Sequence, residues 1–166
     1  TAGVRPDLRG FAYLKTGRAD QALPLFRGNL RWHVNYFGEQ HDDTAAVRGL
    51  YAAALWKTGD KVLSRQQFEQ AVKVLTSPGG LSGDVTEGAY RLKVKKFIFQ
   101  TYMEMLAETA TQNTKDAALI FELADYLHAS SVQQALTDAA VRSGVNVPGL
   151  VDIIRKEQDA KNEMVS

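Results

Sequence analysis

The sequence AYLKTG at residues 12–17 returns as ALWKTG at residues 54–59, which is 42 residues further along the chain. The glycine that ends each copy is followed nine positions later by a phenylalanine, Phe26 in the first case and Phe68 in the second. A period of roughly 20–50 residues is typical of stacked repeat units. The two copies therefore predict a repeated structural unit rather than a chance tripeptide match.

The residues around each copy predict a helix, a turn and a second helix. Apolar residues stand at helical spacing before Gly17, at Leu8, Phe11 and Leu14. Gly17 then supplies the left-handed conformation that ends a helix at low steric cost. Gly59 is expected to end the first helix of the second unit in the same way. The unit is thus predicted to be a helical hairpin.

Polar residues and one proline predict where the helices begin. Asp20 is expected to cap the second helix of the first unit, with Pro24 in its first turn, where a missing N–H is tolerated. Asp42 or Asp43 is expected to cap the first helix of the second unit. These signals place two hairpins one after the other.

The remaining chain predicts more helices and no strands. A Gly- and Pro-rich loop at 76–83 precedes a helical pattern at about 84–110 and a partner helix that starts near Ala117, interpreted as a third, degenerate repeat. Two more helices are expected, at about 131–142 and from Pro148 past Asp159. No stretch shows the two-residue alternation of strands.

The predicted fold class is all-α: an α-α superhelix, or solenoid of helical hairpins, with a C-terminal helical extension. Each hairpin needs its neighbours to bury its apolar face. The predicted organisation is repeats over 1–128, at about 5–37, 43–77 and 84–128, and an extension over 129–166 that leads to a downstream region. Because the chain starts without Met and ends within a helical pattern, we expect it to be a piece of a longer protein.

Composition narrows the function classes. Lys and Arg total 20 against 19 for Asp and Glu, so charge predicts neither nucleic acid nor an anionic membrane as partner. No apolar run approaches the roughly 20 residues of a membrane span. Cysteine is absent, which removes thiolate chemistry. The sequence does not decide between cytoplasm and periplasm, although the cytoplasm is slightly favoured.

The first two units resemble tetratricopeptide repeats (TPR). The small, aromatic and turn positions of that pattern are occupied by Gly10, Ala12, Tyr13, Gly17, Ala22 and Phe26 in the first unit, and by Ala52, Leu55, Gly59, Phe68 and Ala71 in the second. The period of 42 residues is longer than the usual period of about 34. The resemblance implies a non-catalytic protein-interaction module rather than an enzyme, with no cofactor and with a protein or peptide as partner.

A second resemblance covers about 45 residues of the tail. The segments 120–125 (IFELAD), 131–136 (SVQQAL) and 150–159 are similar to the region leading into the caspase-like CHAT domain of bacterial TPR–CHAT proteins. That domain carries a His/Cys dyad in its peptidase members, and no residue here matches the dyad. The resemblance implies that catalysis would lie beyond Ser166 and that the adjacent CHAT domain is a candidate partner.

In tetratricopeptide arrays the first helix of each repeat lines a concave groove. By this resemblance the predicted groove residues are Asp7, Phe11, Leu14, Lys15, Ala53, Trp56 and Lys57, with Gly49 beside them. Two lysines in register beside apolar surface would suit a peptide that carries an acidic residue. The other interpretation is that these residues pack against neighbouring helices or another domain.

Catalytic and metal sites find little support in the sequence. His41 beside two aspartates lacks the further converging ligands of a metal site, and capping of the next helix is the better interpretation. Glu104, Glu108 and Glu122 carry the alternative function, a helical-bundle metal- or ligand-binding domain, but the Glu-x-x-His motif of such bundles is absent. A structural spacer or oligomerisation element is a third, weaker option. We therefore predict no catalytic residue and no metal ligand.

Overall fold

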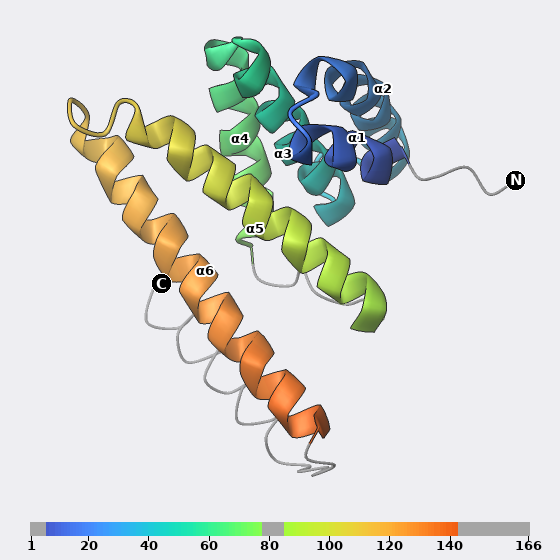
Figure 1. The fold of residues 1–166 in the computed structure, drawn as a ribbon, viewed down its shortest axis with the longest axis vertical. Helices are drawn as coiled ribbons and strands as arrows, with labels where there is room; N and C mark the ends of the chain where they lie inside the picture. The colour runs from blue at the N-terminus through green and yellow to red at the C-terminus, as the bar shows by residue number, and fades with distance from the viewer. Residues whose placement is uncertain (1–5, 78–84, 143–166) are drawn as a thin grey trace, which may run out of the picture. The chain divides into compact units, whose positions relative to one another are not determined.

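A computed structural model describes residues 6–77 and 85–142, and these residues form helices and turns without a strand. The helices are α1 (Pro6–Lys15), α2 (Ala19–Phe37), α3 (Asp42–Thr58), α4 (Lys61–Leu75), α5 (Val85–Ala107) and α6 (Thr114–Arg142). Successive helices pair as α1 with α2 and α3 with α4, and α2 also packs against α3. The predicted all-α helical-repeat fold is confirmed (Figure 1).

The repeated Lys-Thr-Gly sequence ends α1 and α3 with the same hydrogen bonds. Gly17 and Gly59 have φ angles of 76° and 100°, in the left-handed region where a side chain would add strain. The residue after each glycine donates its N–H to a carbonyl five residues earlier, Arg18 to Tyr13 at 2.8 Å and Asp60 to Leu55 at 2.9 Å. This pattern satisfies carbonyls that a helix end leaves unpaired. The glycine terminations predicted from the repeat are thus confirmed.

The helix starts differ from the prediction in two places. The α3 cap is His41, whose Nδ1 accepts a hydrogen bond from the Asp43 N–H at 3.1 Å, so the two aspartates lie in the first turn. There their negative charges interact favourably with the positive end of the helix dipole. The start of α2 lies one residue before Asp20, which is therefore also a first-turn residue rather than a cap. In α4, Asp60 is a true cap and accepts from Leu63 N–H.

Pro24 lies deeper in α2 than predicted. Because α2 begins at Ala19, Pro24 is beyond the first turn and occupies a position where an N–H would bond to the carbonyl four residues earlier. The prediction that it sits in the first turn was wrong, because the residue that caps α2 is Arg18 and not Asp20. Pro24 is exposed, so its ring meets solvent rather than a neighbouring helix.

In the first hairpin, the second helix packs an aromatic side chain against a small residue of the first helix. Phe26 is fully buried against Gly10, where an added Cβ would lie 2.7 Å from the ring. In the second hairpin the equivalent phenylalanine, Phe68, is also fully buried. Ser64 donates its hydroxyl to the carbonyl of Ala52 at 2.8 Å, which satisfies a buried polar group at this close approach. The small residues of the repeat therefore set the spacing between helices.

Helix α5 packs against α3 and α4 of the second hairpin, and its aromatic side chains contact α1 of the first (Figure 1). Its Phe97 ring meets the Phe11 ring of α1 edge-on, with centroids 5.1 Å apart. Its Ile98 is fully buried beside Gly49 of α3. Its Tyr102 stacks on Phe68 of α4 at 4.8 Å. One helix thus joins the two hairpins into a single core.

Helix α6 runs without a break from Thr114 to Arg142. The prediction of two separate helices, ending near His128 and restarting near Ser131, was wrong because Ala129-Ser130-Ser131 contains no glycine or proline to end a helix. The chain divides into two compact units, residues 1–127 and 128–166, and α6 contributes to both. The helix predicted from Pro148 onward lies outside the described residues.

Candidate partner-binding site

The structure divides the seven predicted groove residues by exposure. Leu14 and Ala53 are buried, with 3% and 0% of their surface exposed. Among the others, Asp7, Phe11 and Trp56 are half-buried and Lys15 and Lys57 are exposed. Leu14 and Ala53 are therefore core residues that no partner can reach in this structure, which corrects their place in the predicted groove. A partner-binding role for the remaining five stays a prediction.

Helix α5 covers part of the side of α1 and α3 on which the predicted groove lies, where it contacts Phe11 and Gly49. We call this side the α1/α3 face, defined by Phe11 and Lys15 on α1 and by Gly49, Ala53 and Trp56 on α3. Phe11 contacts the rings of both Tyr90 and Phe97 on α5. The chain thus fills part of its own predicted groove with α5, which agrees with the other interpretation of these residues, that they pack against neighbouring helices.

Two lysines remain accessible at the rim of the α1/α3 face. Lys15 places its Nζ 5.3 Å from the centre of the Phe97 ring, and Lys57 places its Nζ 5.1 Å from that of the Trp56 ring. Both are cation–π arrangements, which orient a lysine without neutralising its charge. Among the described residues no carboxylate lies within ion-pair distance of either lysine. The rim therefore presents two positive charges at equivalent repeat positions, each beside an aromatic ring.

The alternative function, a metal- or ligand-binding bundle, depends on the carboxylates of Glu104, Glu108 and Glu122, and these do not come together as metal ligands. In the described part of the chain, no three His, Cys, Asp or Glu side chains are grouped as metal ligands. Glu108 instead pairs with Lys61 at 2.6 Å, and Asp43 pairs with Arg91 at 2.9 Å. The structure does not support a metal-binding bundle at Glu104, Glu108 and Glu122.

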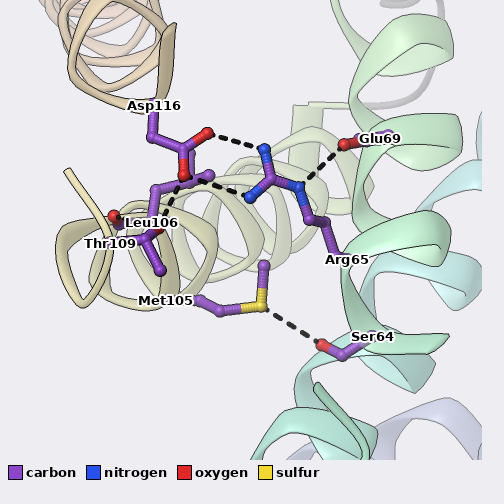
Figure 2. Close-up of polar contacts among 7 residues, drawn as sticks. All are labelled: Ser64, Arg65, Glu69, Met105, Leu106, Thr109 and Asp116. Atoms are coloured by element: carbon purple, nitrogen blue, oxygen red, sulfur yellow. Dashed lines mark hydrogen bonds and ion pairs between the residues drawn. The ribbon is translucent and has the colours of Figure 1, made fainter. Parts of the chain in front are cut away.

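The strongest polar cluster was not foreseen from the sequence, and it joins α4 to the start of α6 (Figure 2). Arg65 donates two hydrogen bonds to the Asp116 carboxylate, from Nη1 to Oδ2 at 3.1 Å and from Nη2 to Oδ1 at 2.6 Å. Thr109 Oγ1 donates to Asp116 Oδ2 at 2.6 Å, and Arg65 also bonds Glu69 at 3.1 Å. Asp116 is only 1% exposed. The buried Asp116 carboxylate is therefore paired with a charged partner, and the ion pair links α4 to α6.

These contacts govern the protonation of Asp116. The Arg65 guanidinium, followed by the Thr109 hydroxyl, lowers the pKa of Asp116 to about 2, against the opposing effect of burial. The same ion pair raises the pKa of Arg65 above its ordinary value. The charged form is thus strongly held, which is the behaviour of a structural ion pair rather than of an acid–base group. In the sequence the two residues are 51 positions apart, with no motif to connect them.

Tyr102 illustrates a buried group without a partner. Its ring stacks on Phe68, but within the described part of the chain its hydroxyl has no hydrogen bond although it is buried. Burial raises the pKa of Tyr102 to about 12, so it stays neutral at physiological pH. We expect Tyr102→Phe to leave the free energy of unfolding within about 0.5 kcal/mol of the wild-type value or to raise it, because an unpaired buried hydroxyl is removed. Urea unfolding followed by circular dichroism measures this.

Tyr126 is the matched control. Its hydroxyl donates a hydrogen bond to the carbonyl of Leu75 at 3.2 Å and accepts one from the Lys95 ammonium group at 2.6 Å. Tyr126→Phe is therefore expected to lower the free energy of unfolding by about 1 kcal/mol. Equal losses in the two variants would show that the Tyr102 hydroxyl has a partner after all, such as an ordered water.

Comparison with known proteins agrees with the hairpin geometry. Residues 7–77 match the family described as Tetratricopeptide repeat. The match spans α1 to α4, so these two hairpins are a tetratricopeptide repeat region. No curated protein and no solved structure matches the chain. None of the described helices is long and apolar enough to cross a membrane.

Tetratricopeptide repeats are scaffolds that generally mediate protein–protein interaction, and stacked repeats present extended surfaces for that purpose. A protein or peptide is therefore the class of partner that the family match supports. The match ends before α5, which is the helix that closes over the α1/α3 face in this chain.

Proposed function

We propose that this chain is a non-catalytic interaction scaffold that binds a protein through the rim of its α1/α3 face. The observation that carries the proposal is the pair of exposed lysines, Lys15 and Lys57, each placed over an aromatic ring at equivalent positions of two hairpins. Cations beside partly exposed aromatic surface favour an anionic segment with apolar neighbours. Asp7, Phe11 and Trp56 form the rest of the proposed contact surface, whereas Leu14 and Ala53 support it from the core.

We further propose that the scaffold belongs to a larger bacterial protein of the TPR–CHAT type, whose adjacent caspase-like domain is the partner. The support is the resemblance of the segments 120–125 and 131–136, which both lie on α6. Reading the codons that follow Ser166 tests this directly. A caspase-like His and Cys pair is expected there, and a downstream sequence without that pair would refute the larger assignment while leaving the scaffold proposal open.

The scaffold proposal is tested by site-specific photo-crosslinking in the native cell. A photo-crosslinking amino acid at Lys57 is expected to give a discrete protein adduct, and the same amino acid at Gln66, which is exposed on α4, is the control. Mass spectrometry of the adduct identifies the partner and shows whether it belongs to the same chain. Adducts of equal yield at Lys57 and Gln66 would contradict the proposal.

The same experiment tests whether the charges of the two rim lysines contribute to partner binding. Lys15→Glu, introduced into the Lys57 crosslinking variant, is expected to reduce the adduct yield severalfold because it reverses one of the two rim charges. Lys73→Glu changes an equally exposed lysine on α4 and should leave the yield unchanged. An identical effect of both substitutions would mean that net charge, rather than the rim, controls binding.

A further inference from the structure

A second surface lies between the two hairpins, at a pocket of about 330 Å³ formed by α2, α3 and α4. All of its lining residues fall between Arg27 and Gln67, and none comes from α5. On α3 the lining residues are Arg48 and Tyr51, whereas Gly49 and Ala53 belong to the α1/α3 face. The pocket is therefore separate from the surface proposed above.

The pocket carries an excess of positive charge. Its lining includes three arginines, Arg27, Arg31 and Arg48, against one carboxylate, that of Glu39. Arg27 and Arg31 are four residues apart, so they share one side of α2, and both are exposed. In the described part of the chain neither is within ion-pair distance of a carboxylate. Two exposed guanidinium groups of the pocket lining are thus available to bind an anion.

Arg48 is a buried residue of the pocket lining whose guanidinium group is already paired. It is 7% exposed and donates from Nη1 to the side-chain oxygens of Gln67 and Gln70, at 2.9 and 2.8 Å. Its Nη2 pairs with Glu39, which uses the single carboxylate of the pocket. Glu39 is therefore already paired, and the positive charges of Arg27 and Arg31 are left without an internal counterion.

Part of the pocket lining is aliphatic. Leu30 and Val34 line it from α2, and Leu63 lines it from α4. The volume is at the low end of the range of roughly 300–1,000 Å³ for small-molecule pockets. A pocket of this size, lined by two exposed arginines and by three aliphatic side chains, suits an acidic side chain and its apolar neighbour.

We propose that this pocket is a second partner-binding site and that it receives an acidic-apolar peptide segment, an Asp or Glu beside an aliphatic residue, from a protein partner. The carboxylate is bound by the guanidinium groups of Arg27 and Arg31, whose planar donors match a carboxylate in pairs. The aliphatic neighbour packs on Leu30 and Leu63. The site thus places a contact on the second helices of the hairpins, apart from the rim lysines.

The test uses a fluorescein-labelled ten-residue peptide that contains two Glu-Leu pairs, together with a matched peptide in which Gln replaces each Glu. Fluorescence anisotropy is expected to show binding of the Glu peptide at least about tenfold tighter than of the Gln peptide, as loss of a charge-assisted hydrogen bond implies. The double variant Arg27→Glu/Arg31→Glu should lose that preference. Both residues are exposed, so circular dichroism is expected to show an unchanged fold.

The controls locate the site. Lys73→Glu should retain the Glu peptide, and so should the rim variant Lys15→Glu/Lys57→Glu, which separates this pocket from the α1/α3 face. Binding that survives Arg27→Glu/Arg31→Glu but is lost in the rim variant would overturn the proposal and assign the peptide to the rim. Binding of N-acetylglutamate or inorganic phosphate as tightly as of the peptide would also overturn it, because the pocket would then accept a free small anion.

Discussion

Gly49→Leu is expected to lower the free energy of unfolding by about 3 kcal/mol, since overpacking a tight helix contact carries a cost of this order. Gly49 is buried in α3, and a Cβ added there would lie 2.6 Å from Cγ2 and 2.7 Å from Cδ1 of Ile98. Ile98 is itself fully buried, so it cannot swing into solvent. The new side chain must push α5 away from α3, and urea unfolding measures the loss.

Gly28→Leu is the matched control. Gly28 lies inside α2, is exposed, and has no atom within 4 Å of an added Cβ. The same substitution should therefore stabilise the protein by up to about 1 kcal/mol through helix propensity. A double-mutant cycle of Gly49→Ala with Ile98→Ala should reveal a coupling in which the second substitution relieves the first. Equal effects of leucine at Gly28 and Gly49 would show that α5 does not pack on α3 as described.

Arg65→Met is expected to lower the free energy of unfolding by about 3 kcal/mol, which is more than Asp116→Asn is expected to cost. The asymmetry follows from exposure, because Asp116 is 1% exposed and the Arg65 side chain 38% exposed. Removing Arg65 leaves a buried carboxylate without its counterion, whereas removing Asp116 leaves a guanidinium that water can reach. For Asp116→Asn we expect a loss of about 1–2 kcal/mol. Chemical denaturation of both variants at pH 7 compares them.

The ion pair between Arg65 and Asp116 is also expected to make the free energy of unfolding depend on pH. The folded-state pKa of Asp116, about 2, lies below its ordinary value of 3.8, so the unfolded chain takes up the proton first. The stabilisation is therefore complete above about pH 4 and is lost as the pH falls toward 2. Its size is up to about 2 kcal/mol, reduced from the full shift because Arg65 is partly solvated.

In Arg65→Met this acid-dependent loss should shrink, since the largest cause of the lowered pKa is gone. The measurement is the free energy of unfolding between pH 5 and pH 2, with Arg65→Lys as the conservative variant that keeps the charge but not the paired geometry. A pH profile of Arg65→Met that matches the wild-type profile would show that Asp116 is not held by Arg65.

Local chemistry explains why the hairpins were predictable. The Lys-Thr-Gly repeat encodes its own turn, because Gly17 and Gly59 adopt the left-handed conformation in the same hydrogen-bond pattern. The buried phenylalanines and small residues repeat at the same spacing, so one hairpin predicts the other. Errors arose where a signal was ambiguous: His41 and Asp43 can both cap a helix, and Ser131 is tolerated in the interior of α6.

The candidate site was only partly predictable for a different reason. A residue such as Ala53 or Lys57 can be assigned to the correct helix from the repeat, but its exposure depends on which other helix covers it. In the folded chain Ala53 is buried and Lys57 is exposed. Likewise, Arg27 and Arg31 stand out from other surface arginines only because α3 and α4 form a pocket beside them.

The sequence by itself determined the helical hairpins of this protein, since turns, caps and apolar periodicity act over a few residues and leave a readable pattern. Only the tertiary structure decided that α5 closes over Gly49 and that Arg65 meets Asp116. It also decided that two arginines flank a pocket whose one carboxylate is already engaged. These features join residues far apart in the chain, where the burial and charge of each side chain depend on its partner, and no local pattern records that pairing.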